Sequence, residues 1–274
     1  MSEFPIGLQM YSVRDDLASD FEGTIKAVAG MGYDGVEFAG LYGHTPAEAK
    51  AVCDRYGVKI VSIHSSLEEL SSDPEGFVKD FASSGCENIV ITYLLEDFRA
   101  GHPRFGEVIE SAKVIGGVCN RYGLNLLYHN HDFDFAKVGG DYALDVLYRE
   151  VPAELLKSEL DTCWIDYVGV DPAEYIRKYA GRVPVIHLKD FVMPGKKSEK
   201  GGPNVGIDGI EFDKVESFWF RPVGYGVLNV DNIVDAARFA GTKWLVVEQD
   251  MPALGKSALE CAQMSVEFLK KTYG

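Results

Sequence analysis

Eight short apolar runs that alternate with amphipathic stretches of helical length constrain the fold of this chain more than any other feature. The apolar runs lie at residues 6–12, 35–40, 59–64, 88–94, 125–130, 158–162, 184–190 and 244–250. The clearest amphipathic stretches lie at residues 21–32, 45–57, 105–123 and 257–274. Strands that alternate with helices in this way predict an α/β protein, a (β/α)8 TIM barrel formed by one domain over residues 1–274. An open dinucleotide-binding sheet is disfavoured because no GxGxxG motif follows the first run.

Local chemistry marks several helix ends. Thr45 and Glu48 have the spacing of a capping box, in which each side chain satisfies a backbone amide at the start of a helix. The tripeptide Arg-Tyr-Gly ends two helical stretches, at Gly57 and Gly123, where glycine supplies the left-handed cap. We therefore expect each of these helices to turn directly into the next strand.

One segment departs from the alternation. The residues from about 191 to 229 are rich in Gly, Lys and Pro and are too numerous for an ordinary connection. We predict an extended loop that follows the seventh strand and lies over the barrel mouth, rather than a domain boundary.

Composition excludes several classes of function. The chain has 27 Lys and Arg against 42 Asp and Glu, a formal net charge of −15, so it repels phosphate backbones and anionic membrane surfaces. Its five Cys are scattered without a CxxC pair, which is typical of reduced thiols. The first residues lack a basic leader with a long apolar stretch, and no apolar run approaches the length of a membrane span. We expect a soluble cytoplasmic protein that binds neither nucleic acid nor membranes.

Ionisable side chains recur at the ends of the predicted strands. They are Glu37, His64, His129, His131, Asp161, His187, Lys189, Asp190, Glu248 and Asp250. Active sites of such barrels are built at the C-terminal ends of the strands, so the convergent set predicts a functional site. The last four strands each offer one strong metal ligand, and these are His129, Asp161, His187 and Glu248. Mixed nitrogen and carboxylate donors favour Mn, Co, Fe or Zn over Ca.

Four ordered motifs carry a family resemblance. They are LLYHNHDFDF at 126–135, ELDTCWIDYVGVDP at 159–172, VIHLKD at 185–190 and VVEQD at 246–250. In this order they resemble the sugar phosphate isomerase/epimerase group of the xylose isomerase-like TIM barrels. The opening segments GLQMYSVRDDL at 7–17 and GYDGVEFAG at 32–40 are similar to that group too. The resemblance covers nearly the whole chain, and it specifies the superfamily without specifying a substrate.

The resemblance implies one divalent cation near the barrel mouth, with Mn or Zn favoured over Co, Fe and Mg. Relatives commonly hold it with Glu, Asp, His and Glu, and the last three correspond to Asp161, His187 and Glu248. The first ligand departs, because the fifth strand carries His129 within the sequence YHNH.

The implied chemistry is proton transfer next to a carbonyl. The metal acts as a Lewis acid that stabilises an enediolate, and the leading hypothesis is isomerisation or epimerisation of a sugar or keto-sugar derivative. Glu248 is one candidate proton carrier, and His131, His64 or Glu37 is the second. Because His129 replaces a carboxylate, a metal-dependent lyase that dehydrates an inosose or eliminates from a 3-keto-glycoside is the alternative.

Five side chains are candidate substrate contacts. They are Glu37, Lys189, Trp164, Phe38 and Tyr11. Core packing is the alternative role for Trp164 and Phe38, and Lys189 could equally neutralise a buried carboxylate. Glu159 points inward but deeper than Asp161, and we expect it to be structural, paired with Lys189 or a histidine.

The expected partner is a small carbohydrate, and a homodimer is the expected assembly. An endonuclease IV-like DNA-repair enzyme would need a basic groove, which the net charge of −15 disfavours. A non-catalytic sugar-binding barrel is a further alternative.

Overall fold

The computed structural model describes residues 4–195 and 217–273, and its centre is a closed barrel of eight parallel strands. The barrel strands are β1 (Ile6–Gln9), β2 (Gly35–Phe38), β3 (Lys59–Ser65), β4 (Asn88–Ile91), β5 (Asn125–His129), β8 (Lys157–Asp161), β9 (Val185–Leu188) and β12 (Trp244–Val247). Each strand pairs with the next along the chain, and β12 closes the barrel on β1. All eight predicted strands belong to it, so the predicted (β/α)8 fold is confirmed.

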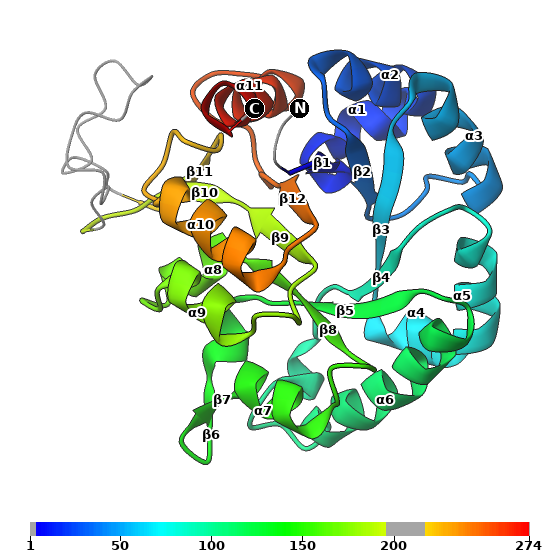
Figure 1. Ribbon diagram of the computed structural model, residues 1–274, viewed down its shortest axis with the longest axis vertical. Helices are drawn as coiled ribbons and strands as arrows, with labels where there is room; N and C mark the ends of the chain where they lie inside the picture. The colour runs from blue at the N-terminus through cyan, green and yellow to red at the C-terminus, as the bar shows by residue number, and fades with distance from the viewer. Residues whose placement is uncertain (1–3, 196–216, 274) are drawn as a thin grey trace.

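Helices surround the barrel on its outside (Figure 1). They are α1 (Arg14–Ser19), α2 (Phe21–Met31), α3 (Pro46–Tyr56), α4 (Leu67–Ser72), α5 (Pro74–Ala82), α6 (Phe105–Arg121), α7 (Ala143–Glu150), α8 (Thr162–Tyr167), α9 (Pro172–Lys178), α10 (Val230–Ala240) and α11 (Ala258–Tyr273). The predicted capping box of α3 is present, with Thr45 N–H donating to Glu48 Oε2 at 2.8 Å. Gly57 and Gly123 have the expected positive φ of 72° and 74°. Within the described parts of the chain, no helix combines the length and apolarity that a membrane span requires.

The inside of the barrel has an apolar layer near the N-terminal ends of the strands. It consists of Val61, Val90, Leu127, Val185, Trp244 and Val246, a cluster separate from the larger core between strands and helices. A Cβ added at Gly35 would lie 2.7 Å from Val61 Cγ2 and 3.0 Å from the Trp244 ring. Only glycine therefore fits at this position of β2, and the barrel is a packed core rather than a pore.

A β-bulge in β3 adjusts what this strand presents to the interior. Val36 pairs with Ile60, but Glu37 pairs with Ser62, so Val61 is the extra residue. Val61 joins the apolar layer, while Ser62 donates a hydrogen bond to Glu37 and His64 lies near the end of the strand.

After β9, two short strands that are far apart in the sequence pair to form a small antiparallel sheet. Its strands are β10 (Asp190–Val192) and β11 (Trp219–Arg221), and residues 196–216 of the predicted loop lie outside the described residues. Asp190 accepts hydrogen bonds from the backbone N–H groups of Gly224 at 3.0 Å, Gly226 at 2.9 Å and Leu228 at 3.1 Å. These bonds hold the returning chain against the barrel, so Asp190 serves the fold.

Candidate active site

The four predicted metal ligands converge at the C-terminal end of the barrel. His129 ends β5, Asp161 ends β8, His187 lies in β9, and Glu248 follows β12. One ligand atom from each residue lies within 4.8 Å of the others, and all four side chains are buried. His187 Nδ1 is 3.0 Å from Glu248 Oε2, and His129 Nε2 is 3.8 Å from Asp161 Oδ2. The alternation of the strands thus brings together residues that are far apart in the sequence.

The hydrogen bonds of Asp161 leave one carboxylate oxygen for a cation. Oδ1 accepts the backbone N–H groups of Cys163 at 2.8 Å and Trp164 at 3.2 Å. Oδ2 is buried and accepts no hydrogen bond from residues 4–195 or 217–273. Burial raises the pKa of Asp161 to about 7, which disfavours its charged form unless positive charge lies beside it. Two imidazoles and two carboxylates around this oxygen fit a divalent cation of the Zn or Mn type.

Lys189 supplies positive charge beside the same carboxylates. Its Nζ lies 2.8 Å from Asp250 Oδ2, 3.2 Å from Glu248 Oε2 and 3.8 Å from Asp161 Oδ2. Burial lowers the pKa of Lys189, but these negative charges outweigh it and raise the pKa above its usual value. The ammonium group is therefore charged at neutral pH.

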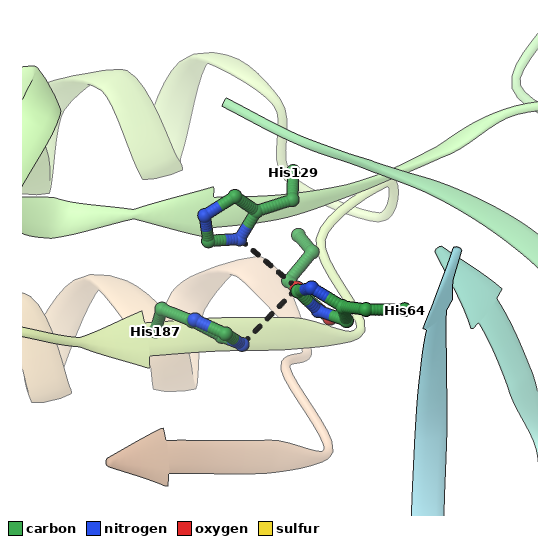
Figure 2. A group of neighbouring side chains, drawn as sticks. His64, His129 and His187 are labelled. Carbon is green, nitrogen blue, oxygen red and sulfur yellow. Dashed lines mark hydrogen bonds and ion pairs between the residues drawn. The ribbon is translucent and has the colours of Figure 1, made fainter. Parts of the chain in front are cut away.

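Beneath the four ligands lies a second layer of buried ionisable groups, which we call the floor layer: Glu37, His64 and Glu159. Glu159 Oε1 lies 2.7 Å from His64 Nε2, 3.1 Å from His129 Nδ1 and 3.1 Å from His187 Nε2. Figure 2 shows the three imidazole rings pointing toward one another from their strands. The prediction that Glu159 is buried and paired with a histidine is confirmed.

Glu37 completes the floor layer. Its Oε1 accepts hydrogen bonds from Gln9 Nε2 at 2.6 Å and His187 Nε2 at 2.7 Å, and lies 2.8 Å from His64 Nε2. Burial lowers the pKa of His64, but the charges of Glu37 and Glu159 outweigh it and raise the pKa to about 10. The same two carboxylates raise the pKa of His187 against its burial. The floor layer therefore alternates negative and positive groups.

A cavity of about 460 Å³ borders the candidate ligands, a size suited to a small molecule. Its lining comprises Gln9, Tyr11, Ala39, His64, Thr92, Tyr93, His129, His131, Trp164, Lys189, Glu248 and Asp250. Five residues predicted to be catalytic or to contact substrate lie in this wall, in addition to two of the predicted ligands. They are Tyr11, His64, His131, Trp164 and Lys189.

His131 is held between aromatic rings in the cavity wall. Its ring stacks on Phe133 at 5.3 Å between centroids and on Trp164 at 6.0 Å, and it lies 5.0 Å from the His129 ring. Burial holds the pKa of His131 well below its usual value, so the imidazole is neutral at pH 7. Its Nδ1 atom has no hydrogen-bond partner in the described part of the chain. His131 thus presents a neutral imidazole in the cavity wall.

The structure contradicts two predicted substrate contacts. Phe38 is buried on the outer face of β2, where its ring lies 5.8 Å from that of Phe21 in α2. Glu37, one residue earlier, points into the barrel but lies in the floor layer, fully buried and bonded to protein groups. Because successive strand residues face opposite sides, these two neighbours could not both reach one cavity.

Sequence reasoning missed several residues of the site. Gln9 ends β1, two residues after Gly7, and its amide bridges Glu37 and the backbone N–H of Tyr11. Alternation along β1 was the signal that could have found it. Thr92 and Tyr93 follow β4, where the end of the strand carries neither a carboxylate nor a histidine to attract notice. Asn130 accepts the backbone N–H of Asp161 at 3.0 Å and so helps to fix that ligand.

The fold and the four converging side chains define a TIM barrel with a candidate metal centre at its mouth. The profile of the xylose isomerase-like TIM barrels matches residues 25–272, and the chain belongs to this family. The family resemblance predicted from the four motifs is therefore confirmed.

Relatives within the superfamily carry different activities in their names. The chain is 22% identical over 218 residues to an inosose dehydratase of Geobacillus kaustophilus, covering 69% of this chain and 70% of the relative. A sugar phosphate isomerase/epimerase structure from Parabacteroides distasonis superposes with a TM-score of 0.76 at 19% identity, covering 98% of this chain and 94% of that one. The IolI protein with a bound zinc atom superposes with a TM-score of 0.69 at 13% identity, covering 100% and 99%. The structural likeness concerns the fold, and the names do not select one activity.

Proposed function

We propose that this protein is a divalent-metal-dependent dehydratase that removes water from an uncharged keto-polyol of the inosose type. The observation that carries the proposal is the pairing of a neutral His131 with a charged Lys189 on one cavity, beside the four candidate ligands. A base and an acid of unlike charge suit elimination of water, in which one group takes a proton and the other gives one. Similarity to inosose dehydratases supports the same reaction class.

His129, Asp161, His187 and Glu248 would hold the metal ion in this proposal. The ion would supply Lewis-acid polarisation of the substrate carbonyl, which acidifies the neighbouring C–H bond. Asp161 Oδ2, a buried oxygen that accepts no hydrogen bond from the described residues, supports this ligand set.

Side chains of the protein carry out the remaining steps. His131 removes the proton from the carbon next to the carbonyl, and the electron pair of that C–H bond becomes part of the new carbon–carbon double bond. The C–O bond to the neighbouring hydroxyl breaks, and Lys189 donates the proton with which the hydroxyl leaves as water. The proton on His131 then returns to Lys189 through solvent.

The charges around the cavity support an uncharged substrate. Within the described lining Lys189 is the single lysine or arginine, and three carboxylates already surround it. A phosphate group would face Glu248 and Asp250 without a cation of its own. Lys196, Lys197 and Lys200 lie outside the described residues.

Isomerisation or epimerisation of a keto-sugar is the second candidate. The observation that favours it is that Glu248 also lines the cavity, so that a carboxylate and His131 could exchange protons with neighbouring carbons. In this reaction Lys189 would have no role as a proton donor.

A homodimer remains a prediction.

Incubation of the metal-loaded protein in D₂O with an inosose, a 3-keto-glucoside and ketohexoses tests the proposal. Mass spectrometry and NMR distinguish loss of water from deuterium uptake at carbon without loss of water. We expect dehydration of the inosose. Deuterium uptake with conserved composition in every substrate would favour the isomerase and contradict the dehydratase.

Two variants assign the roles. With Lys189→Met we expect deuterium uptake to continue while water loss falls, because the base remains and the acid is gone. With His131→Ala we expect both to fall together. His44→Ala is the control, because His44 stacks on Phe21 and does not line the cavity.

A further inference from the structure

We infer that Glu159 is a positioning residue that selects which ring nitrogen of His129 and of His187 binds the metal ion. The inference rests on the metal centre of the proposed function and assigns a role to the floor layer beneath it. In this role Glu159 contacts neither the ion nor the substrate and acts through the two histidines.

Three imidazoles surround one oxygen of the Glu159 carboxylate. Glu159 is fully buried, and its Oε1 faces one imidazole nitrogen each of His64, His129 and His187 at 2.7 to 3.1 Å. A carboxylate oxygen accepts hydrogen bonds from the groups around it. Each nitrogen at hydrogen-bond distance from Glu159 Oε1 must therefore carry a hydrogen, which assigns N–H to His129 Nδ1 and His187 Nε2.

The opposite nitrogen of each ring then faces the candidate ligands. His129 Nε2 points to Asp161 Oδ2 at 3.8 Å, and His187 Nδ1 points to Glu248 Oε2 at 3.0 Å. When an ion replaces the hydrogen on His187 Nδ1, Nε2 keeps its own hydrogen because Glu37 and Glu159 both face it. A carboxylate that binds the far nitrogen of a metal-bound histidine fixes the ring orientation and raises its basicity.

The same geometry argues against a second ion in the floor layer. His64, His129, Glu159 and His187 also form a group of four close ligand atoms. Their contacts of 2.7 to 3.1 Å, however, are made by nitrogens that hold hydrogens toward Glu159 Oε1. His129 and His187 belong to both groups, and in its neutral form each ring has one nitrogen lone pair. That lone pair is directed to the four candidate ligands, where Asp161 Oδ2 has no hydrogen-bond donor among the described residues. The geometry therefore assigns one ion per chain.

The two floor carboxylates have separable effects. Glu159 contacts both ligand histidines, whereas Glu37 contacts His187 alone. Removing the Glu159 carboxylate leaves His187 with Glu37 but leaves His129 Nδ1 without its carboxylate partner. His129 could then adopt the other tautomer and withdraw the lone pair that faces Asp161.

Titration of Co²⁺ against a competing chelator measures the role of Glu159. Relative to the wild type, we expect Glu159→Gln to weaken Co²⁺ binding about tenfold and Glu159→Leu about a hundredfold, the range for loss of a partner outside the ligand set. The visible spectrum of bound Co²⁺ should change in Glu159→Leu, because the spectrum reports the ligands and their geometry. If Glu159→Leu fails to fold, Glu159→Gln remains as an isosteric variant.

Asp145→Asn is the matched control. Asp145 Oδ1 also accepts three donors, from Tyr175 at 2.7 Å, Lys178 at 2.7 Å and Tyr179 at 2.5 Å, but it does not line the cavity. We expect this variant to lose thermal stability while its Co²⁺ affinity and spectrum stay those of the wild type.

Nitrogen-15 NMR of the zinc-loaded protein gives a direct readout, because it reports which ring nitrogen carries hydrogen. We expect Nδ1–H on His129 and Nε2–H on His187. Zinc bound through His129 Nδ1, two ions per chain, or unchanged affinity and spectrum in both Glu159 variants would each overturn the inference. A wild-type protein that binds no Co²⁺ would instead refute the metal centre of the proposed function.

Discussion

The inside of the barrel is apolar at one end and ionisable at the other, although the same strands build both ends. Leu127 and His129 in β5 lie two residues apart, as do Val185 and His187 in β9. Because alternate strand residues face the same side, a step of two residues moves from the apolar layer to the candidate ligands. Val246 and Glu248 repeat the pattern at β12.

The two ends of the barrel interior contribute to the stability of the fold in opposite directions. The apolar layer stabilises the fold by about 25 cal/mol for each Å² of apolar surface that it buries. The ionisable end buries charges whose desolvation costs several kcal/mol per ion, repaid only where partners are well placed. On these energetic grounds the apolar layer is the structural half of the interior, and the ionisable end is the half to which we assign the proposed function.

The largest expected effect is the loss of bound metal when a candidate ligand at the ionisable end is replaced. His187→Ala and Asp161→Ala each remove one candidate ligand, and we expect bound metal to fall to background after purification and dialysis. His44→Ala, outside the cavity, should keep the metal content of the wild type. Elemental analysis of the three proteins measures the difference, and equal metal content in all three would show that the ligand assignment is wrong.

The next effect concerns chemistry without metal loss. His131→Ala should lower turnover of the dehydrated substrate by about 10²–10⁴-fold, the usual contribution of a general base. Its metal content should stay unchanged, since His131 is outside the candidate ligand set. Steady-state kinetics with parallel metal analysis checks both expectations, and loss of metal together with turnover would place His131 among the ligands.

The sequence predicts the barrel well because the fold follows from the hydrophobic periodicity of its strands and helices. That periodicity can be recognised in each segment separately. The eight apolar runs and the strand-end positions of the four candidate ligands follow from alternation and from the strand order of a barrel. The tautomers of His129 and His187 could not be predicted in this way, because they depend on Glu159, a residue on another strand. Short-range patterns do not report which nitrogen faces which carboxylate.

The errors have local causes. Phe38 is a predicted substrate contact with core packing as its alternative role, and the structure shows the packing, because Phe38 and its neighbour Glu37 face opposite sides of the strand. The bulge at Val61, which helps Ser62 and His64 reach the polar interior, leaves no mark in the sequence pattern. Depth along the strand separates Glu37 in the floor layer from the cavity above it, and sequence alternation gives the face but not the accessible depth.

The apolar layer should respond in the opposite way to substitution. Leu127 is fully buried there, and Leu127→Ala should lower the free energy of unfolding by about 2–5 kcal/mol through lost burial and a residual cavity. Metal affinity of the folded protein should remain that of the wild type. Urea unfolding and Co²⁺ titration measure the two quantities, and a large loss of affinity would show that the two halves of the interior are coupled.

The smallest expected effect is the stabilisation that the metal itself gives. An ion that binds only the folded chain adds about 2.7 kcal/mol when its free concentration is a hundred times Kd. For a chain of this size, a change of 1 kcal/mol corresponds to roughly 2–4 °C in Tm, so a chelator should lower Tm by a multiple of that amount. Asp161→Ala, whose metal site is broken, should melt at the same temperature with and without the chelator. A chelator-induced shift of equal size in both proteins would mean that the ion binds elsewhere. The ionisable end of the barrel would then not be the metal centre.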